Sequence, residues 1–212
     1  MEIEYKGANC LEISAGKATV IIDPKISLVG LKDYTPKGAI QVATSEEFVV
    51  HAQEQKLIID GPGEYEVSNV SIKGVAAGRH IDTDLDEHKA TIFRIEAGGV
   101  RVGIIGHINA KLSDAQLEDL GVLDILCIPV GGRGYTLDAH SATAITRQIG
   151  PKIVIPTHYA DKQLNYEVPQ DELTPFVKEL GASLSETLPK LKIKTSSVLP
   201  ETLTVIELNR TS

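Results

Sequence analysis

The residues best suited to chemistry in this chain are its six histidines, because imidazole both binds metals and transfers protons near neutral pH. Two of them follow apolar runs that are typical of buried strands. His107 comes after Val-Gly-Ile-Ile-Gly, and His158 comes after Lys-Ile-Val-Ile-Pro-Thr. In a parallel sheet, the carboxyl ends of the strands form the crevice where ligands bind. We therefore expect His107 and His158 at a functional site, although each one alone is also compatible with a structural histidine.

Motifs for nucleophilic catalysis and phosphate binding are missing from the sequence. The chain has no Gly-x-Ser-x-Gly elbow, no Gly-x-x-x-x-Gly-Lys loop and no Gly-x-Gly-x-x-Gly turn. Its two cysteines, Cys10 and Cys127, lie in apolar runs without an adjacent His or basic residue to activate a thiol. We expect neither covalent catalysis nor a disulfide framework.

The 212-residue chain has an ordinary globular composition, with 42% hydrophobic and 24% charged residues. Its formal net charge of -8 argues against nucleic acid or an anionic membrane as the partner, since both attract clustered Lys and Arg. No apolar run approaches the ~18 residues of a transmembrane helix, and the first residues lack the pattern of a signal peptide. We expect a cytoplasmic protein that folds as a single domain over residues 1–212.

Short apolar runs separated by Gly, Pro and Asp predict strands along the first half of the chain. Several alternate polar with apolar residues, which is typical of half-buried antiparallel strands. The predicted strands are Glu2–Tyr5, Cys10–Ser14, Ala18–Asp23, Ile40–Thr44, Lys56–Asp60, Gly63–Val67 and Val70–Val75.

The second half of the chain predicts a hairpin followed by helices that alternate with buried strands. The hairpin joins Ala90–Glu96 to Arg101–Gly106. The later elements are a helix from a Ser113 N-cap to Gly121, a strand at Asp124–Val130, a helix at Asp138–Ile149, a strand at Lys152–Thr157, a helix from Pro169 to Leu180 with Asp171 and Glu172 in its first turn, and a strand at Leu203–Leu208. This order predicts an α/β domain with helices packed outside its sheets.

Five segments, in this order and at this spacing, resemble small bacterial members of the metallo-β-lactamase superfamily. They are Met-Glu-Ile-Glu-Tyr-Lys-Gly-Ala-Asn-Cys at the start, Val20–Pro24, Ile59–Val67, Ile128–Gly132 and Pro151–Tyr159. The resemblance covers nearly the whole chain. It implies a four-layer αβ/βα sandwich and the chemistry of a metal-dependent hydrolase.

The metal-binding positions that the resemblance implies carry other residues in this chain. The family's His-x-His-x-Asp-His motif follows the strand predicted at Ile40–Thr44. On that alignment its four ligands are replaced by Ser45, Glu47, Val49 and Val50. Valine cannot coordinate a metal, so most of the first ligand group is lost.

The other family ligands are also altered, with one exception. His107 stands where the family has the acid that bridges two metals. The histidine of an early Gly-His-Ser-Cys pattern is also missing, because the chain has Gly7-Ala8-Asn9-Cys10 there. The next family histidine falls at Arg79 or His80. Only His158 matches unchanged. We therefore expect that the two-metal centre is lost.

Three interpretations follow. In the first, the chain is a non-catalytic family member without a cofactor, and its cleft binds a small molecule or an anion. Arg79, Arg133 and the backbone N–H groups of Gly131 and Gly132 are the candidate anion-binding groups. The alternative for the Gly131–Gly134 segment is a plain flexible turn.

The second interpretation is a hydrolase with a rebuilt site for one Zn²⁺ or another divalent metal. Glu47, His107 and His158, with His80, are its candidate ligands, and Glu46 is the nearest carboxylate that could act as a base. The third is a structural subunit, which the low aromatic content of 4% does not favour. The substrate and the oligomeric state stay open.

Overall fold

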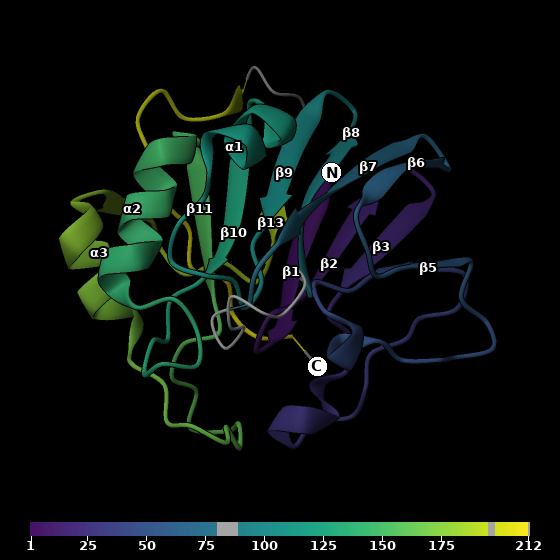
Figure 1. Ribbon diagram of the computed structural model, residues 1–212, viewed down its shortest axis with the longest axis horizontal. Helices are drawn as coiled ribbons and strands as arrows, with labels where there is room; N and C mark the ends of the chain where they lie inside the picture. The colour runs from purple at the N-terminus through teal and green to yellow at the C-terminus, as the bar shows by residue number, and fades with distance from the viewer. Residues whose placement is uncertain (80–88, 195–197, 212) are drawn as a thin grey trace.

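The computed structural model describes residues 1–79, 89–194 and 198–211. Two β-sheets pack face to face, and the three α-helices of these residues lie beside the larger sheet (Figure 1). The helices are α1 (Asp114–Leu120), α2 (Ala139–Ile149) and α3 (Leu173–Leu180). Two short 3-10 helices, η1 (Ile26–Val29) and η2 (Glu46–Phe48), follow strands of the smaller sheet.

The smaller sheet has six strands among the described residues. Their order is β13 (Leu191–Lys192), β1 (Glu2–Gly7), β2 (Cys10–Ala15), β3 (Ala18–Ile22), β4 (Ile40–Val42) and β5 (Leu57–Ile59). The strands from β13 to β3 are antiparallel to their neighbours, whereas β3, β4 and β5 run parallel.

The larger sheet has eight strands in the described part of the chain. Their order is β12 (Ser183–Leu184), β14 (Thr204–Val205), β11 (Ile153–Thr157), β10 (Ile125–Pro129), β9 (Val100–Ile104), β8 (Ala90–Ala97), β7 (Val70–Ala77) and β6 (Gly63–Val67). Strands β9, β10 and β11 are parallel, so their carboxyl ends meet at one edge of the sheet.

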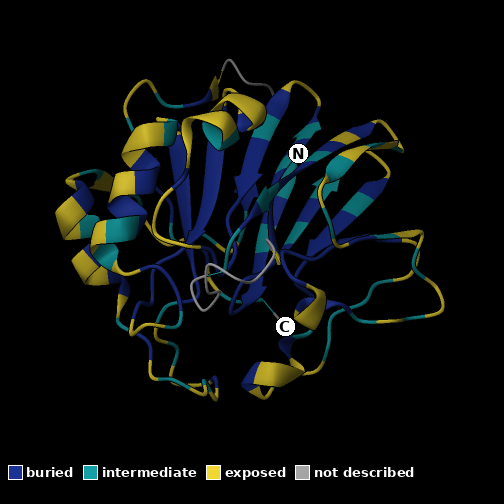
Figure 2. Ribbon diagram, viewed as in Figure 1, coloured by how far each residue is buried: buried dark blue, intermediate teal, exposed yellow. Residues whose placement is uncertain are grey.

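Apolar residues on both faces of the larger sheet form two separate cores. In β10, Ile125 and Cys127 face the smaller sheet, and Leu126 and Ile128 face the helices. Every residue of β10 and β11 is buried, as Figure 2 shows in dark blue. Burial on both faces explains why these strands have continuous apolar sequences rather than alternating ones.

The smaller sheet is covered on its outer side by loops. Cys10 and Ile21 point away from the inter-sheet core and pack against Ile26 and Val29 of η1 and against Leu164. Within the described residues no α-helix contributes to this cluster. None of the helices of the described residues combines the length and the apolar character needed to cross a membrane.

Most predicted elements are present, with corrected ends. The hairpin of β8 and β9 and the capping box of Ser113 and Gln116 at α1 are confirmed. The expected helix from Pro169 begins only at Leu173, so Asp171 and Glu172 lie outside it. The predicted Leu203–Leu208 strand is reduced to β14. The sequence pattern did not indicate the two-residue strands β12 and β13.

The two sheets touch where β4 and β9 end. The Thr91 N–H donates to the Thr44 carbonyl across the sheets at 2.8 Å, and Gly106 lies directly against the Thr44 side chain. A Cβ on Gly106 would lie 2.3 Å from Thr44 Oγ1. This contact fixes the spacing of the two sheets at the edge where the parallel strands end.

We predict that Gly106→Ala lowers the free energy of unfolding by about 2 kcal/mol or more, because the added methyl group overlaps Thr44. Urea unfolding followed by circular dichroism measures the change. Gly61→Ala is the matched control, since a Cβ there has nothing within 4 Å. Equal stabilities of the two variants would contradict the proposed sheet contact.

Candidate functional site

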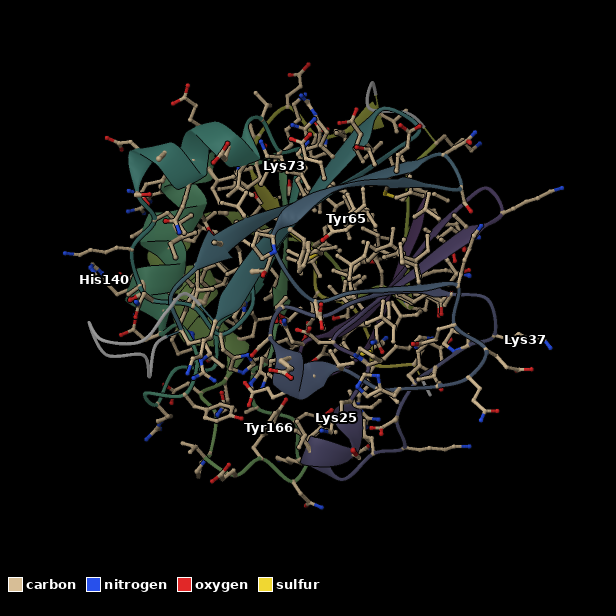
Figure 3. The ribbon with its side chains drawn as sticks, turned by 45° about the vertical axis from the view of Figure 1, so that its right-hand side comes forward. Lys25, Lys37, Tyr65, Lys73, His140 and Tyr166 are labelled. Carbon is tan, nitrogen blue, oxygen red and sulfur yellow. The ribbon has the colours of Figure 1, made fainter. Side chains whose placement is uncertain are left out.

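A cavity of about 150 Å³ lies at the edge where strands of both sheets end. We call it the strand-end cavity. Its walls come from the turn after β1, the loops after β3, β4, β9 and β10, and the loop between β11 and α3. Lys25 and Tyr166, which come from two of these loops, lie near each other at the same end of the molecule (Figure 3).

The two histidines at strand ends both line this cavity. Their rings pack edge to face with centroids 4.8 Å apart, and both residues are buried. The Nδ1 atom of His158 lies 3.2 Å from Gln170 Oε1, and its backbone N–H donates to the Ala8 carbonyl at 2.8 Å. Burial lowers the pKa of His158 to about 4, so this imidazole is neutral at physiological pH.

Three further rings surround the histidines. Phe48 lies 5.1 Å from His107, Tyr135 lies 5.2 Å from His107, and Tyr166 lies 4.9 Å from His158, measured between ring centroids. The chain has only three Phe, six Tyr and no Trp. The gathering of one Phe and two Tyr around the histidines therefore concentrates a scarce residue class in the cavity wall.

A buried carboxylate forms part of the cavity floor. Asp23 accepts hydrogen bonds from the Thr44 N–H, the Thr44 hydroxyl and Asn9 Nδ2, each at 2.7 Å. Asn9 Oδ1 accepts from the Thr157 hydroxyl at 2.6 Å. This network connects β3, β4 and the β1–β2 turn of one sheet to β11 of the other.

Desolvation raises the pKa of Asp23 to about 6, although its three hydrogen-bond donors act in the opposite direction. The Glu47 carboxylate adds a smaller upward contribution to the pKa of Asp23. Burial and the charges of Glu47 and Glu167 also raise the pKa of Tyr135. The charges of Glu47 and Glu167 thus both act on the interior of the cavity.

Unusual backbone angles gather at the same place. Ala8, Asp23 and His158 all have positive φ, at 49°, 44° and 49°, and all three line the cavity. Non-glycine residues rarely adopt such angles, and where they do so together the surrounding structure holds them there. Here the Asp23 network and the bond from His158 N–H to Ala8 supply that support.

The loop between β11 and α3 closes one side of the cavity. The Ala160 N–H donates to the Asp171 carbonyl at 2.9 Å, and the Asp171 N–H donates to the Gly131 carbonyl at 2.7 Å. The Asn165 N–H donates to Val29 of η1 at 3.0 Å. Asp171 thus belongs to this loop, and α3 begins at Leu173 rather than at Pro169 as its sequence predicts.

The residues predicted for anion binding are not brought together. Arg79 lies in a separate open groove with Ser45, Glu46 and Lys89. Arg133 lies on an exposed turn, where its Nε donates to Asp171 Oδ1 at 2.6 Å.

The glycines of that turn serve the turn itself. The Gly132 N–H donates to the Thr136 hydroxyl at 2.8 Å, and the Gly131 carbonyl accepts from Asp171. Neither glycine lines the strand-end cavity, so the structure favours the structural interpretation of this segment.

The predicted metal ligands are only partly brought together. Glu47, His107 and His158 line the strand-end cavity. Glu46 lines only the neighbouring groove, which Glu47 lines as well. Glu46 and Glu47 belong to a 3-10 helix, not to an extended segment. His80 lies outside the described residues. Within residues 1–79, 89–194 and 198–211, no three His, Cys, Asp or Glu side chains converge closely enough to hold a metal ion.

Two of the positions at which this chain lacks a family metal ligand are buried. Val49 packs with Ala43 and Phe48 in a small apolar cluster, and Ser45 is buried. Val49 therefore contributes to apolar packing at its position.

Several cavity residues were not singled out from the sequence. Tyr135, Tyr166 and Glu167 come from loops without a recognisable motif, and Gln170 was placed in a helix. Phe48 appeared only as a neighbour of the altered motif. The one available signal was the segment Gly7–Cys10, where the family pattern Gly-His-Ser-Cys is replaced and which contributes Ala8 and Asn9 to the cavity.

Comparison with known proteins decides the family. Residues 2–158 match the model of the beta-lactamase superfamily domain. The chain belongs to this family. The superfamily and fold class predicted from the sequence are therefore confirmed.

Individual relatives of this superfamily member are distant in sequence. A protein of Natranaerobius thermophilus named UPF0173 metal-dependent hydrolase is 25% identical over 190 residues, which cover 75% of this chain and 83% of the relative. A crystal structure from Thermotoga maritima, described as a Zn-dependent hydrolase of the metallo-beta-lactamase superfamily, has a TM-score of 0.76 at 24% identity over 98% of this chain and 99% of the other.

A third relative is a metal-dependent hydrolase structure from Parabacteroides distasonis. It has a TM-score of 0.64 at 19% identity and covers 98% of this chain and 93% of the other. At these identities the structural likeness establishes the fold alone.

We predict that Thr44→Val lowers the free energy of unfolding by about 1–3 kcal/mol, because it removes a hydroxyl donor to the buried Asp23 carboxylate. Thr143→Val is the control with the opposite expectation. The buried Thr143 hydroxyl has no hydrogen-bond partner among the described residues, so its removal is neutral or stabilising. Urea unfolding of both variants tests the pair, and a harmless Thr44→Val contradicts the network.

We predict that the proton equilibrium of His158 lowers the free energy of unfolding as the pH falls from 6.5 to 4. The unfolded chain binds a proton at this imidazole below about pH 6.5, whereas the folded chain does so only near pH 4. The neutral, buried His158 makes its full contribution to the free energy of unfolding above pH 6.5, and about 3 kcal/mol of that contribution is lost by pH 4. Asp23 acts in the opposite direction between about pH 4 and 6, because its pKa is raised.

Comparison of variants separates the two effects. In metal-free protein, His158→Asn, which suits a positive φ, flattens the acid side of the stability curve. The matched control is His140→Asn, at an exposed histidine outside the cavity. An NMR titration of His158 with a midpoint near 6.5 would contradict its burial as a neutral ring.

Proposed function

We propose that this superfamily member uses its strand-end cavity to bind a small ligand and does not carry a two-metal hydrolytic centre. The observation that carries the proposal is the set of side chains around the cavity. The lining contains His, Asp and Glu side chains, but among the described residues no three of them converge to hold a metal ion, and aromatic rings lie among them. A two-metal centre needs several anionic and imidazole ligands to balance the charge of the ions.

The state of Asp23 supports this proposal. Its carboxylate oxygens already accept three hydrogen bonds from Asn9 and Thr44, and the residue is buried. Moving this carboxylate to a metal would leave those donors without their acceptor, at a cost of about 1–3 kcal/mol for each buried group. Asp23 is thus better suited to hold loops together than to bind an ion.

A second candidate function is a hydrolase with one metal. It is favoured by the packing of His107 against His158 and by the presence of Glu47 in the same cavity. His80 is the fourth predicted ligand and Glu46 the predicted base. A metal held there would supply an activated water for hydrolysis, in keeping with the relatives described as metal-dependent hydrolases.

Metal content distinguishes the two functions. We predict that untagged protein purified without chelator contains well below one Zn²⁺ or Mn²⁺ per chain by plasma mass spectrometry. Two tightly held ions per chain would overturn the proposal. One ion that is lost in Glu47→Gln and in His158→Asn, and kept in the exposed His140→Asn, would establish the one-metal site instead.

A further inference from the structure

The walls of the strand-end cavity are made of aromatic rings and carboxylates, and this combination indicates the charge of its ligand. We propose that the cavity binds a small organic cation, in particular an alkylated or quaternary ammonium group. The inference rests on the proposed ligand-binding function and names the ligand class of the same site.

The rings supply the first part of the argument. Phe48, Tyr135 and Tyr166 pack around His107 and His158, with neighbouring ring centroids between 4.8 and 5.7 Å apart. The faces of aromatic rings carry negative electrostatic potential and attract cations within about 6 Å of the centroid.

The fixed charges supply the second part. Asp23, Glu47 and Glu167 line the cavity, and Lys25 is the one lysine or arginine of the lining, beside the two histidines. Glu47 and Glu167 are exposed at the rim, and the charges of both act on Tyr135 inside. The arginines predicted for an anion do not line the cavity: Arg79 lies in the neighbouring groove, which Glu47 also lines, and Arg133 is paired with Asp171. The lining therefore has an excess of negative charge.

Hydrogen-bonding capacity selects the kind of cation. A primary ammonium needs acceptors for three N–H donors. The Asp23 oxygens at the cavity floor are already used by Asn9 and Thr44, and ring faces do not replace the lost bonds to water. An alkylated ammonium presents C–H groups in place of N–H groups, so ring contacts and long-range attraction to Glu47 and Glu167 are sufficient for it.

Calorimetric titration of the full-length, chelator-treated protein tests the proposal with choline and tetramethylammonium as probes. The matched neutral probe is 3,3-dimethylbutan-1-ol, which has the shape of choline without its charge. We expect choline to bind about tenfold or more tightly than the neutral probe at low salt. Absence of choline binding, or equal binding of the neutral probe, overturns the inference.

Two pairs of variants locate the binding. Tyr135→Leu removes a ring and weakens choline binding several-fold, whereas Tyr135→Phe keeps the ring and the affinity. Glu47→Gln weakens choline binding, whereas Glu46→Gln, the adjacent exposed acid outside this cavity, does not. Thermal unfolding of each variant confirms that it folds. Choline binding that is unaffected by both Tyr135→Leu and Glu47→Gln places the site elsewhere and overturns the proposal.

Failure of this inference differs from failure of the proposed function. Binding of inorganic phosphate in preference to choline, with competition at the same cavity, overturns the choice of a cation and keeps a ligand-binding cleft. Two tightly held metal ions per chain overturn the proposed function itself, whatever the result with choline.

Discussion

The carboxylate of Asp23 joins the loops on which the arrangement of the strand-end cavity depends. It holds the loop after β4 through Thr44 and the β1–β2 turn through Asn9, and Asn9 extends the link to Thr157 of β11. An unpaired buried carboxylate is strongly unfavourable, so the loops must remain where their donors reach it. The positive φ angles of Ala8, Asp23 and His158 persist in the same constrained region.

The cavity combines an ordinary superfamily framework with unusual contents. The parallel strands β9, β10 and β11 still end at one edge, and His158 still follows β11. Of the positions from which family metal ligands are expected, Val49 packs in an apolar cluster, whereas Glu47 and His107 line the cavity. The fold therefore determines where side chains lie, whereas the residue types at these positions determine which ligands the cavity can bind.

Elements formed by local sequence and burial were predictable. The apolar runs of β10 and β11 indicate strands covered on both faces, and Ser113 with Gln116 indicates the start of α1. The start of α3 was not predictable, since Asp171 is held by Gly131 and Arg133 from a distant segment. Strands of two residues, such as β12 and β13, are too short to show the alternation of polar and apolar residues that predicts a strand.

The candidate site was predictable to a similar extent. His107 and His158 were expected at one site because each follows a buried strand, and both line the cavity. Phe48, Tyr135 and Tyr166 lie far apart in the chain, and nothing near them in sequence indicates that they meet. Arg133 seemed available for an anion because its partner Asp171 was assigned to a helix. The site predicted from the sequence thus differs from the site in the structure because contacts between distant loops decide which side chains meet.

The loop between β11 and α3 suggests how relatives of this protein diversify. It is anchored at both ends by backbone hydrogen bonds that involve Ala160 and Asp171, and between them it carries Tyr166 and Glu167 into the cavity wall. Insertions or deletions between these anchors would change the depth and charge of the cavity and leave both sheets intact. A change in the length of this loop is therefore the route that alters the cavity wall with the least disturbance of the two cores.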